Sequence, residues 1–468
     1  MNTESIQFDV SIIGSGPGGY VAAIQGSQLG LRVALIEKES QFGGTCLHTG
    51  CIPTKALLLN AELYEKALKG KEYGILYKDI NLDFSLVQAR KDKIVKKLSN
   101  GINFLMKKNK IHTYRGKGRL TSPGVIQVEG ENVSEIRTRN TIVATGSEAK
   151  LLPGLKLDGQ AILTNKEIVS LDRIPQSLLI IGAGAVGVEF ASVFARFGSD
   201  VTVVEMLPRI LPAEDPEISA EIEKLLTKRK IKFFTGARLE DIKTHEQYVH
   251  AVIADKKGEV LNLKFEKALV AVGRRPVSDG IGLEKLRVNT ARGYLTVDQN
   301  MQTNVPGIFA IGDVVPTQAL AHLASHEGMA AVTYMATGHA EPINYELVPS
   351  CTYCSPEVAS VGLTDVRARE KGFDVITSKF PFAAVSKATI LGESDGFVKL
   401  VSEKKYRQIL GIHMVGPHVT ELTAEAASLI GLEATAADLS HLIHPHPTVS
   451  EGIMEAAHLL YSGAAIHF

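Results

Sequence analysis

Two cysteines five positions apart stand in a glycine-rich stretch, GGTCLHTGCIPTK, at residues 43–55. Cys46 and Cys51 are two of only four cysteines in 468 residues, which is too few for a disulfide framework. A close pair of thiols can be a structural disulfide, part of a metal site or a reversible redox centre. His48 stands between them, but no fourth ligand is near in the sequence, and the spacing disfavours a metal site.

The spacing also disfavours a regular helix across the pair. Residues five apart in a helix are separated by about 7.5 Å of rise, whereas the Cα atoms of bonded cysteines are usually less than about 7 Å apart. Gly43, Gly44 and Gly50 supply the backbone freedom for a distorted turn, and the helix proper is expected to start near Pro53. Cys51 then lies at a helix N-terminus, where the dipole stabilises a thiolate. The competing interpretation is two inert cysteines.

A second CxxC, formed by Cys351 and Cys354 in PSCTYCSPEVASVG, has no basic or helical neighbourhood that would activate a thiol. We expect these two cysteines to be inert, with a second redox pair as the alternative.

One nucleotide-binding pattern occurs twice, as FDVSIIGSGPGGYVAAIQGSQLGLRVALIEK at 8–38 and SLLIIGAGAVGVEFASVFARFGSDVTVVEM at 177–206. Each predicts a strand, a GxGxxG turn, a helix of small residues and a second strand that ends in glutamate. The glycines and the acid of the two copies are Gly14, Gly16, Gly19 with Glu37, and Gly182, Gly184, Gly187 with Glu205.

Each part of this pattern has a physical reason. The first glycine permits the tight turn, the second lets the backbone approach a pyrophosphate, and the third lets helix and strand pack closely. The helix N-terminus attracts the phosphates, and the glutamate can accept a hydrogen bond from a ribose 2′-OH. Two dinucleotides are predicted, with glycine-rich turns that bind nothing as the alternative. Glu205 would repel a 2′-phosphate and favours NAD over NADP, although Arg209 is near.

Three further stretches each contain a short apolar strand that is followed by a glycine: TIVATGS at 141–147, ALVAVGRRP at 268–276 and GIFAIGDV at 307–314. Asp313 lies at the end of the last of these strands, directly after Gly312. From the residues alone, an aspartate that caps a turn is the better interpretation.

Together, these motifs resemble the pyridine nucleotide–disulfide oxidoreductase family over essentially the whole chain, including HPHPTVSE near the C-terminus. The resemblance implies FAD in the first nucleotide site and NAD in the second. It also implies that Lys55 lies beside the flavin and pairs with Glu189, although from sequence alone Lys55 is a helix-surface residue. Further cofactor contacts implied by the resemblance are Lys38, Gly44, Thr45, Gly118, Thr145, Gly146, Ser147, Asp313, Leu320, Ala321, His322 and Gly273.

Near the C-terminus, His444 and His446 flank Pro445, and Glu451 follows. A histidine titrates in the range that thiol–disulfide exchange needs, and a carboxylate on its other nitrogen would fix the tautomer. From the residues alone, a surface histidine pair is the better interpretation. The resemblance implies that His446 is the base, held by Glu451, and that it acts on the other subunit of a homodimer. His444 is then a supporting or structural residue.

The predicted fold is α/β, with two Rossmann-like dinucleotide-binding domains and a C-terminal α+β dimerisation domain. The expected divisions are 1–148 for the FAD domain, 149–273 for the NAD domain, 274–346 for a central segment that completes the FAD domain, and 347–468 for the interface domain. In the interface domain, residues 380–401 and 408–419 are expected to form strands and 419–434 a helix.

Within the family, the likeness is greatest to members that oxidise protein-bound dihydrolipoamide to lipoamide and reduce NAD⁺. Cys46 would then exchange with the substrate, Cys51 would face the flavin, and electrons would pass from the thiols through FAD to NAD⁺. No lipoyl-type domain precedes the first strand, so the lipoyl group is expected on a separate acyltransferase of a 2-oxoacid dehydrogenase-type complex. Which such complex it serves is not readable.

The alternatives are a glutathione- or mercuric-reductase-like enzyme and a non-enzymatic component of an assembly. Glu205 disfavours the NADPH of glutathione reductases, and the terminal GAAIHF lacks the extra thiols of mercuric reductases. The formal net charge is +0, from 51 basic and 51 acidic residues, which disfavours nucleic acid or an anionic membrane as the main partner. No membrane span, bound metal or targeting segment is expected, and the chain is predicted to be cytoplasmic.

Overall fold

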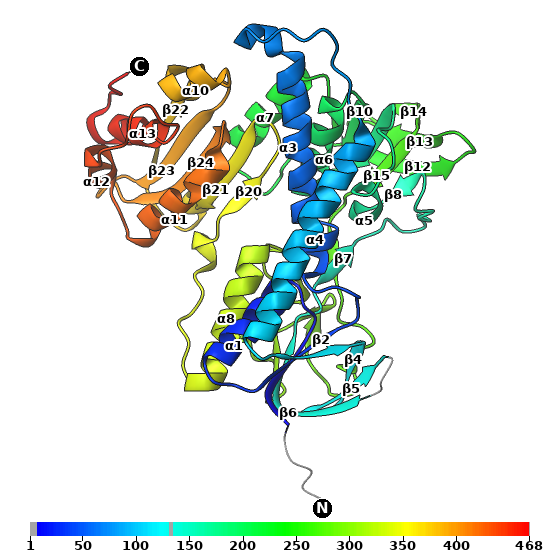
Figure 1. Cartoon of the computed structure of the whole chain (residues 1–468). Coiled ribbons are helices and arrows are strands. Elements are labelled where there is room, and N and C mark those ends of the chain that lie inside the picture. The colour runs from blue at the N-terminus through cyan, green and yellow to red at the C-terminus, as the bar shows by residue number, and fades with distance from the viewer. Residues whose placement is uncertain (1–6, 131–133, 468) are drawn as a thin grey trace, which may run out of the picture. The chain divides into compact units, whose positions relative to one another are not determined.

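The computed structural model describes residues 7–130 and 134–467 (Figure 1). The chain divides into two compact units. The first contains the segments up to Ala56, Leu86–Lys150 and Gly273–Ile343, and the second contains Leu57–Ser85, Leu151–Val272 and the segment from Asn344 onward. Neither the long helices α3 (Cys51–Leu68) and α4 (Phe84–Lys108) nor any other helix in the described ranges is both long and apolar enough to span a bilayer.

The first unit is built on a sheet in which β3, β2, β1 and β6 are parallel neighbours. Strand β19 pairs with the C-terminal end of β6, also in parallel. Strands β1 (Phe8–Ile13) and β2 (Val33–Glu37) are almost wholly buried, as in parallel sheets covered on both faces. The long strand β6 (Ser134–Val143) also pairs with β5, which forms an antiparallel hairpin with β4. The unit's other strands are β3 (His112–Arg115), β4 (Lys117–Ser122), β5 (Val125–Glu129), β7 (Ser147–Ala149), β16 (Arg274–Pro276), β17 (Thr290–Ala291), β18 (Tyr294–Leu295) and β19 (Ile308–Ala310).

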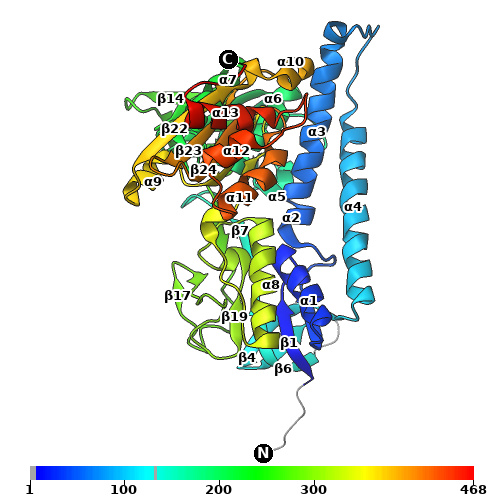
Figure 2. The ribbon, with the colours of Figure 1, turned by 90° about the vertical axis from the view of Figure 1, so that its left-hand side faces the viewer.

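Helices α1 (Pro17–Gln28) and α8 (Ala321–Thr337) lie side by side in this unit (Figure 2). Glycines make this close approach possible. A Cβ on Gly18 would lie 2.9 Å from the carbonyl oxygen of Ala324, and one on Gly328 would lie 2.7 Å from the carbonyl oxygen of Gly18. The helix that follows the first GxGxxG turn is therefore fixed against the helix that follows Asp313.

The second unit repeats the first in its nucleotide-binding half. Its parallel sheet has the order β11-β10-β9-β15-β8. Between β11 and β15 in the sequence, the chain forms a separate antiparallel sheet, β12-β13-β14. The two Rossmann-like halves predicted from the repeat are thus confirmed. The elements are β8 (Ile162–Leu163), α5 (Asn165–Ile168), β9 (Ser177–Ile181), α6 (Ala185–Arg196), β10 (Asp200–Glu205), α7 (Pro216–Lys228), β11 (Lys232–Thr235), β12 (Arg238–Thr244), β13 (Val249–Ala254), β14 (Val260–Phe265) and β15 (Lys267–Val270).

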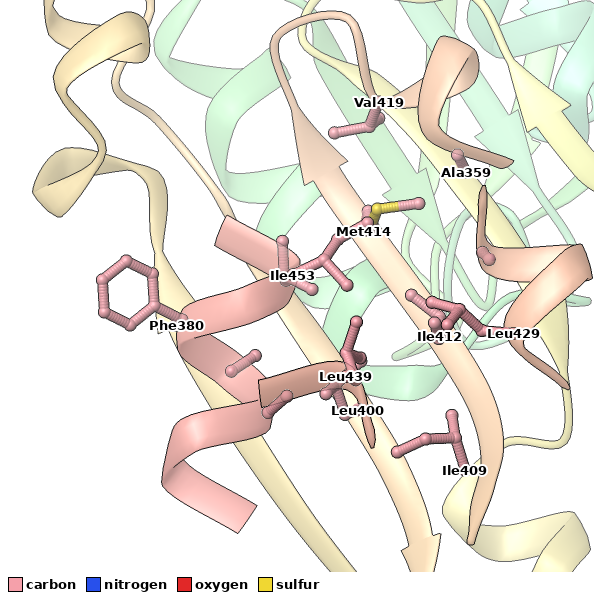
Figure 3. Close-up of a cluster of buried hydrophobic side chains, with 14 of the residues drawn as sticks. Ala359, Phe380, Leu400, Ile409, Ile412, Met414, Val419, Leu429, Leu439 and Ile453 are labelled. Atoms are coloured by element: carbon pink, nitrogen blue, oxygen red, sulfur yellow. The ribbon is translucent and has the colours of Figure 1, made fainter. Parts of the chain in front are cut away.

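The C-terminal part of the second unit is an antiparallel sheet, β20-β21-β24-β23-β22, with a buried hydrophobic cluster (Figure 3). The cluster contains Phe380, Leu400, Ile412 and Met414 from the strands and Ile453 from a helix. This α+β part matches the predicted interface domain. Its elements are β20 (Ser350–Thr352), β21 (Glu357–Gly362), α9 (Asp365–Glu370), β22 (Val375–Pro381), α10 (Ser386–Leu391), β23 (Phe397–Glu403), β24 (Ile409–Gly416), α11 (Thr423–Gly431), α12 (Ala436–His441) and α13 (Glu451–Ser462).

One local prediction in this domain is wrong. Strands are predicted throughout residues 380–401, but the helix α10 separates β22 from β23. Ala388 of α10 is fully buried, and Gly392 ends the helix with a left-handed φ of 70°. The short run of apolar residues is therefore a helical turn that packs on the sheet, a distinction that apolar patterning does not make over so few residues.

Residues 57–85, which the sequence assigns to the FAD domain, belong to the second unit. Glu65 of α3 accepts from Arg196 of α6 at 2.8 Å and from Arg229 at 3.3 Å. These ion pairs join the second half of α3 to the nucleotide-binding part of that unit.

Candidate active site

The two cysteines of GGTCLHTGC lie on either side of a break between two helices. Cys46 is in α2 (Gly44–His48), and Cys51 is the first residue of α3. Between them, a Cβ at Gly50 would lie only 3.0 Å from the carbonyl oxygen of Thr45 and 3.4 Å from the Cα of Cys46. The helix starts two residues before the expected Pro53, and the break removes the separation that a continuous helix would impose.

The two thiols are in contact and interact electrostatically. A hydrogen bond with Cys51, burial and the negative charge of a Cys51 thiolate raise the pKa of Cys46, while the nearby Lys55 ammonium acts in the opposite direction. Both residues are thiols in this structure. When Cys51 is ionised, Cys46 therefore keeps its proton, and a base is needed to make Cys46 a nucleophile.

Tyr20, in the first turn of α1, also lies beside the thiols. Burial and the charge of Cys46 raise the pKa of this tyrosine. In the sequence, Tyr20 is marked only by its position directly after GSGPGG, and that position does not indicate that it lies near the cysteines.

The cysteine segment rests directly on the first nucleotide turn. The Gly43 N–H donates to the carbonyl oxygen of Ser15 at 3.0 Å, and a Cβ on Gly44 would lie 2.6 Å from the Cα of Gly16. His48 anchors the end of α2 through a 2.9 Å hydrogen bond to the carbonyl oxygen of Phe42. A ligand in the first turn would thus adjoin the thiol pair.

The first and third glycines of both turns are required by the protein itself. Gly14 and Gly182 have φ values of 106° and 104°, in the region that favours glycine. A Cβ on Gly19 or Gly187 would lie 1.9 or 2.0 Å from the carbonyl oxygen of the first glycine. These positions make the tight turn and the close packing that the sequence predicts.

The second glycines are different. A Cβ added at Gly16 or at Gly184 would meet no protein atom within 4 Å among the described residues. The fold leaves open space at these two points, each at the N-cap of a helix. This arrangement fits a phosphate that approaches the backbone there.

The two glutamates occupy equivalent positions. Each carboxylate accepts one N–H from the residue after the first glycine and one from the residue two positions beyond itself. For Glu37 the donors are Ser15 (2.9 Å) and Glu39 (2.9 Å), and for Glu205 they are Ala183 (2.7 Å) and Leu207 (2.8 Å). Both carboxylates are thereby oriented at the end of the second strand, where a ribose hydroxyl is expected.

Asp313 belongs to a polar cluster that the sequence does not foresee. Ser147 donates to Asp313 at 2.5 Å, and the Arg274 guanidinium donates to the hydroxyl and the carbonyl of Ser147 at 2.6 Å each. The buried Glu327 of α8 accepts from the Gly312 N–H at 2.6 Å and fixes the turn that carries Asp313. The sequence does not indicate Arg274, because its partner Ser147 lies 127 positions away. It does not indicate Glu327 either, because its partner Gly312 lies 15 positions earlier, outside α8.

The other predicted cofactor residues of the first unit lie as follows. Thr145 donates to the carbonyl oxygen of Val277 at 2.5 Å, and Gly146 and Gly273 have open space at their Cβ positions within the described chain. Tight packing explains the glycine at position 118, because a Cβ there would lie 3.2 Å from side-chain atoms of both Ile13 and Ile36. The rest are the exposed Lys38 after β2, Thr45 in α2, Leu320 at the N-cap of α8, and Ala321 and His322 in its first turn.

At the C-terminal end, His446 and Glu451 form the predicted pair. His446 Nδ1 lies 2.9 Å from one Glu451 oxygen, and the other oxygen accepts from the Thr448 N–H at 2.8 Å. Burial acts to raise the pKa of Glu451, but the hydrogen bonds from Thr448 and His446 outweigh it and lower that pKa. The His446 side chain is 68% exposed.

His444 is held differently. Its Nε2 lies 2.8 Å from Glu425 and its Nδ1 lies 3.1 Å from the carbonyl oxygen of Leu442. The bond to Glu425 raises the pKa of His444, whose side chain is only 7% exposed. Both ring nitrogens are therefore occupied, as in a structural histidine.

In the second CxxC, the buried Cys354 thiol is not activated. Burial and the Glu189 carboxylate raise the pKa of Cys354, which donates to the carbonyl oxygen of Pro356 at 3.1 Å. Glu189 is itself buried and accepts from the Tyr353 N–H at 3.0 Å. In the described ranges, no group of three or more histidine, cysteine or acidic residues is arranged to hold a metal ion.

Comparison with known families matches nearly the whole chain. Residues 8–328 match the model described as pyridine nucleotide-disulphide oxidoreductase, and residues 348–457 match the dimerisation domain of the same family. The second match includes His446 and Glu451 and supports a homodimer.

Individual relatives agree with this match. The chain is 47% identical to a dihydrolipoyl dehydrogenase of Bacillus subtilis (strain 168) over 99% of both proteins. It is 43% identical to one of Mycobacterium leprae (strain TN), covering 98% of this chain and 99% of that protein. Among solved structures, LpdA from Mycobacterium tuberculosis is similar with a TM-score of 0.89 at 26% identity, over 96% of this chain and 99% of that one. The chain belongs to the pyridine nucleotide–disulphide oxidoreductase family.

Proposed function

We propose that this enzyme oxidises dihydrolipoyl groups to lipoyl disulfides and passes the electrons to NAD⁺. The observation that carries the proposal is the pair of interacting thiols, Cys46 and Cys51, seated on the first dinucleotide turn. A thiol pair beside a nucleotide site is what disulfide exchange coupled to a redox cofactor needs. The names of the full-length relatives agree with this activity.

The residues fit the two cofactors. Open space at Gly16 and Gly184 suits a pyrophosphate, and Glu37 and Glu205 are oriented toward a ribose. FAD would be held at the first turn, with Asp313, and NAD at the second. When bound, FAD would accept two electrons from the thiol pair and pass them on to NAD⁺ as a hydride.

The protein's own chemistry is an exchange of disulfides. In the oxidised enzyme, a substrate thiolate attacks the Cys46 sulfur, which breaks the Cys46–Cys51 bond and releases Cys51 as a thiolate. The second substrate sulfur then attacks the first one, forms the lipoyl disulfide and displaces Cys46. Two electrons enter the cysteine pair, and the substrate loses two protons.

The cysteines have different roles because their surroundings differ. Cys51 begins α3, and the positive end of the helix dipole stabilises its thiolate. The pKa of Cys46 is raised, so Cys46 leaves as a thiol and needs a proton at that moment. Cys46 is therefore the sulfur that exchanges with the substrate, and Cys51 is the one that remains ionised.

His446 carries the proton between these sulfurs. Glu451 accepts from Nδ1 and leaves Nε2 to take a proton from the substrate thiol and return it to Cys46. We assign this histidine to the partner subunit, since it lies in the dimerisation domain and its side chain is largely exposed. His444, whose ring nitrogens are both occupied, supports the segment.

The substrate is proposed to be the lipoyl domain of a separate acyltransferase in a 2-oxoacid dehydrogenase-type complex, in the cytoplasm. The test is to mix the FAD-loaded protein with dihydrolipoamide and either NAD⁺ or NADP⁺ and to follow the absorbance of reduced nicotinamide. We expect turnover with NAD⁺, and its loss in Cys46→Ser. Preference for NADP⁺, or undiminished turnover of Cys46→Ser, would overturn the proposal.

A further inference from the structure

The segment that follows Glu205, residues 206–215, is fixed at its middle to the second nucleotide turn. The Leu211 N–H donates to the carbonyl oxygen of Ala183 at 2.8 Å, and Ala183 directly follows Gly182. Leu211 is buried and has a left-handed φ of 43°, a conformation that is unfavourable for a residue other than glycine. Such a conformation persists only where its surroundings impose it.

The end of the same segment is fixed to the C-terminal domain by Glu214. This carboxylate is 7% exposed. One oxygen accepts from the Ser350 hydroxyl at 2.9 Å and the other from the Ser360 hydroxyl at 2.7 Å. Ser350 and Ser360 lie on the neighbouring strands β20 and β21, so the segment is attached to the sheet of the dimerisation domain.

Asp215 makes a second attachment. One of its oxygens accepts from the Glu217 N–H at 2.9 Å and caps α7, and the other lies 2.8 Å from the Lys399 ammonium. Lys399 lies on β23 and also contacts Glu217 at 2.8 Å and Asp365 at 3.0 Å. The side chains of Lys399 and Asp215 are 1% and 0% exposed.

The ion cluster of Lys399, Asp215, Glu217 and Asp365 bears on the arrangement of the chain as well as on its stability. A buried ion pair is often no more stabilising than apolar side chains of the same size, yet loss of one partner leaves an uncompensated charge. Because loss of any partner is costly, the cluster favours the arrangement of these elements in which the charges meet. The lysine is satisfied from two sides, by Asp215 and Glu217 at the nucleotide-binding part and by Asp365 of α9 in the C-terminal domain.

We propose that Lys399, Ser350 and Ser360 are positioning residues for NAD, acting through Asp215 and Glu214 on residues 206–215. The segment directly follows Glu205, where the ribose is expected, and its shape is imposed by contacts at Leu211 and at its end. The dimerisation domain of the same chain thereby sets the affinity for the nicotinamide nucleotide. This inference rests on the proposed NAD site at the second turn.

The test compares two carboxylates of the same lysine. Asp215→Asn keeps the cap of α7 but loses the charge on the segment, whereas Asp365→Asn removes a charge from the other side of Lys399. The affinity of the oxidised, FAD-loaded enzyme for NAD⁺ is measured by calorimetric titration, without turnover. If the segment keeps its binding conformation only one tenth of the time, the Kd rises about tenfold.

We expect this tenfold rise in Asp215→Asn and a change of less than about twofold in Asp365→Asn. The rate of flavin reduction by dihydrolipoamide, measured without NAD⁺, should stay the same in both variants. Equal shifts in Kd for the two variants, or no shift in either, would overturn the inference.

Two further variants complete the test. Gly184→Ala fills the open space of the turn and should weaken NAD⁺ binding; if it does not, the NAD site itself is misplaced and the proposed function fails independently of this inference. If Asp215→Asn does not fold, Ser360→Ala removes one of the two hydrogen bonds to Glu214. An unchanged Kd in Ser360→Ala would then reject the positioning role.

Discussion

Replacement of Glu451 by glutamine tests how the proposed base is oriented. Glu451 accepts two N–H groups, from His446 Nδ1 at 2.9 Å and from the Thr448 backbone at 2.8 Å. An amide has only one acceptor oxygen. Because the backbone N–H of Thr448 can only donate, the amide oxygen should stay with it and the amide NH₂ should face His446.

The tautomer of His446 must then change. Nδ1 becomes an acceptor, the proton moves to Nε2, and that nitrogen no longer accepts a proton from the substrate thiol. Loss of a hydrogen bond to a charged group costs about 1.5–3 kcal/mol. At about 1.4 kcal/mol for each factor of ten, Glu451→Gln should slow thiol–disulfide exchange by about 10- to 150-fold.

The assay is the single-turnover rate of flavin reduction by dihydrolipoamide, compared with the rate of NADH oxidation by an electron acceptor that bypasses the cysteines. Only the first rate should fall. Glu425→Gln is the matched control, since it alters the neighbouring histidine–carboxylate pair and should change the exchange rate less than about threefold. The reasoning is refuted if Glu451→Gln keeps the exchange rate, or if Glu425→Gln loses as much.

Two other predictions concern the first nucleotide turn and the buried histidine. Gly16→Ala should sharply reduce the FAD content of the purified protein, while Gly101→Ala, on the exposed face of α4, should keep FAD and raise stability by about 1 kcal/mol; equal FAD content in both variants would show that the open space is not a phosphate site. Because the folded-state pKa of His444 is raised, its bond to Glu425 stabilises the fold fully below about pH 6.5 and this contribution is lost as the pH rises through the folded pKa. Glu425→Gln should therefore lower Tm more at about pH 6 than at about pH 9, and an equal or larger effect at the higher pH would contradict the assignment.

The sequence predicts those parts of the molecule whose chemistry is local in the chain. The strand–GxGxxG–helix–strand–Glu repeat predicts two parallel sheets, and both are present with equivalent Gly, Glu and helix positions. The hydrogen bond between His446 and Glu451 is equally local, since the partners are only five positions apart and Glu451 begins α13.

Other features depend on partners that no local pattern connects. Arg274 reaches Ser147 across 127 positions, and Lys399 reaches Asp215 across 184. The predicted helix start near Pro53, with Cys51 at the N-terminus, is confirmed by α3, which begins at Cys51; the close approach of Gly50 to α2 that fixes this start is not visible in the sequence. The sequence predicts strand where α10 lies, because six residues are too few to distinguish the helical period from the strand period.

The central claim is that electrons enter and leave through Cys46 and Cys51. It is tested most directly by differential alkylation of the FAD-loaded enzyme, first oxidised and then after anaerobic reduction with dihydrolipoamide, with mass spectrometry of the labelled peptides. Cys46 and Cys51 should be protected in the oxidised enzyme and labelled only after reduction, while Cys351 and Cys354 should label equally in both states. If the labelling of Cys46 and Cys51 does not change, or if Cys351 and Cys354 change instead, the account is contradicted.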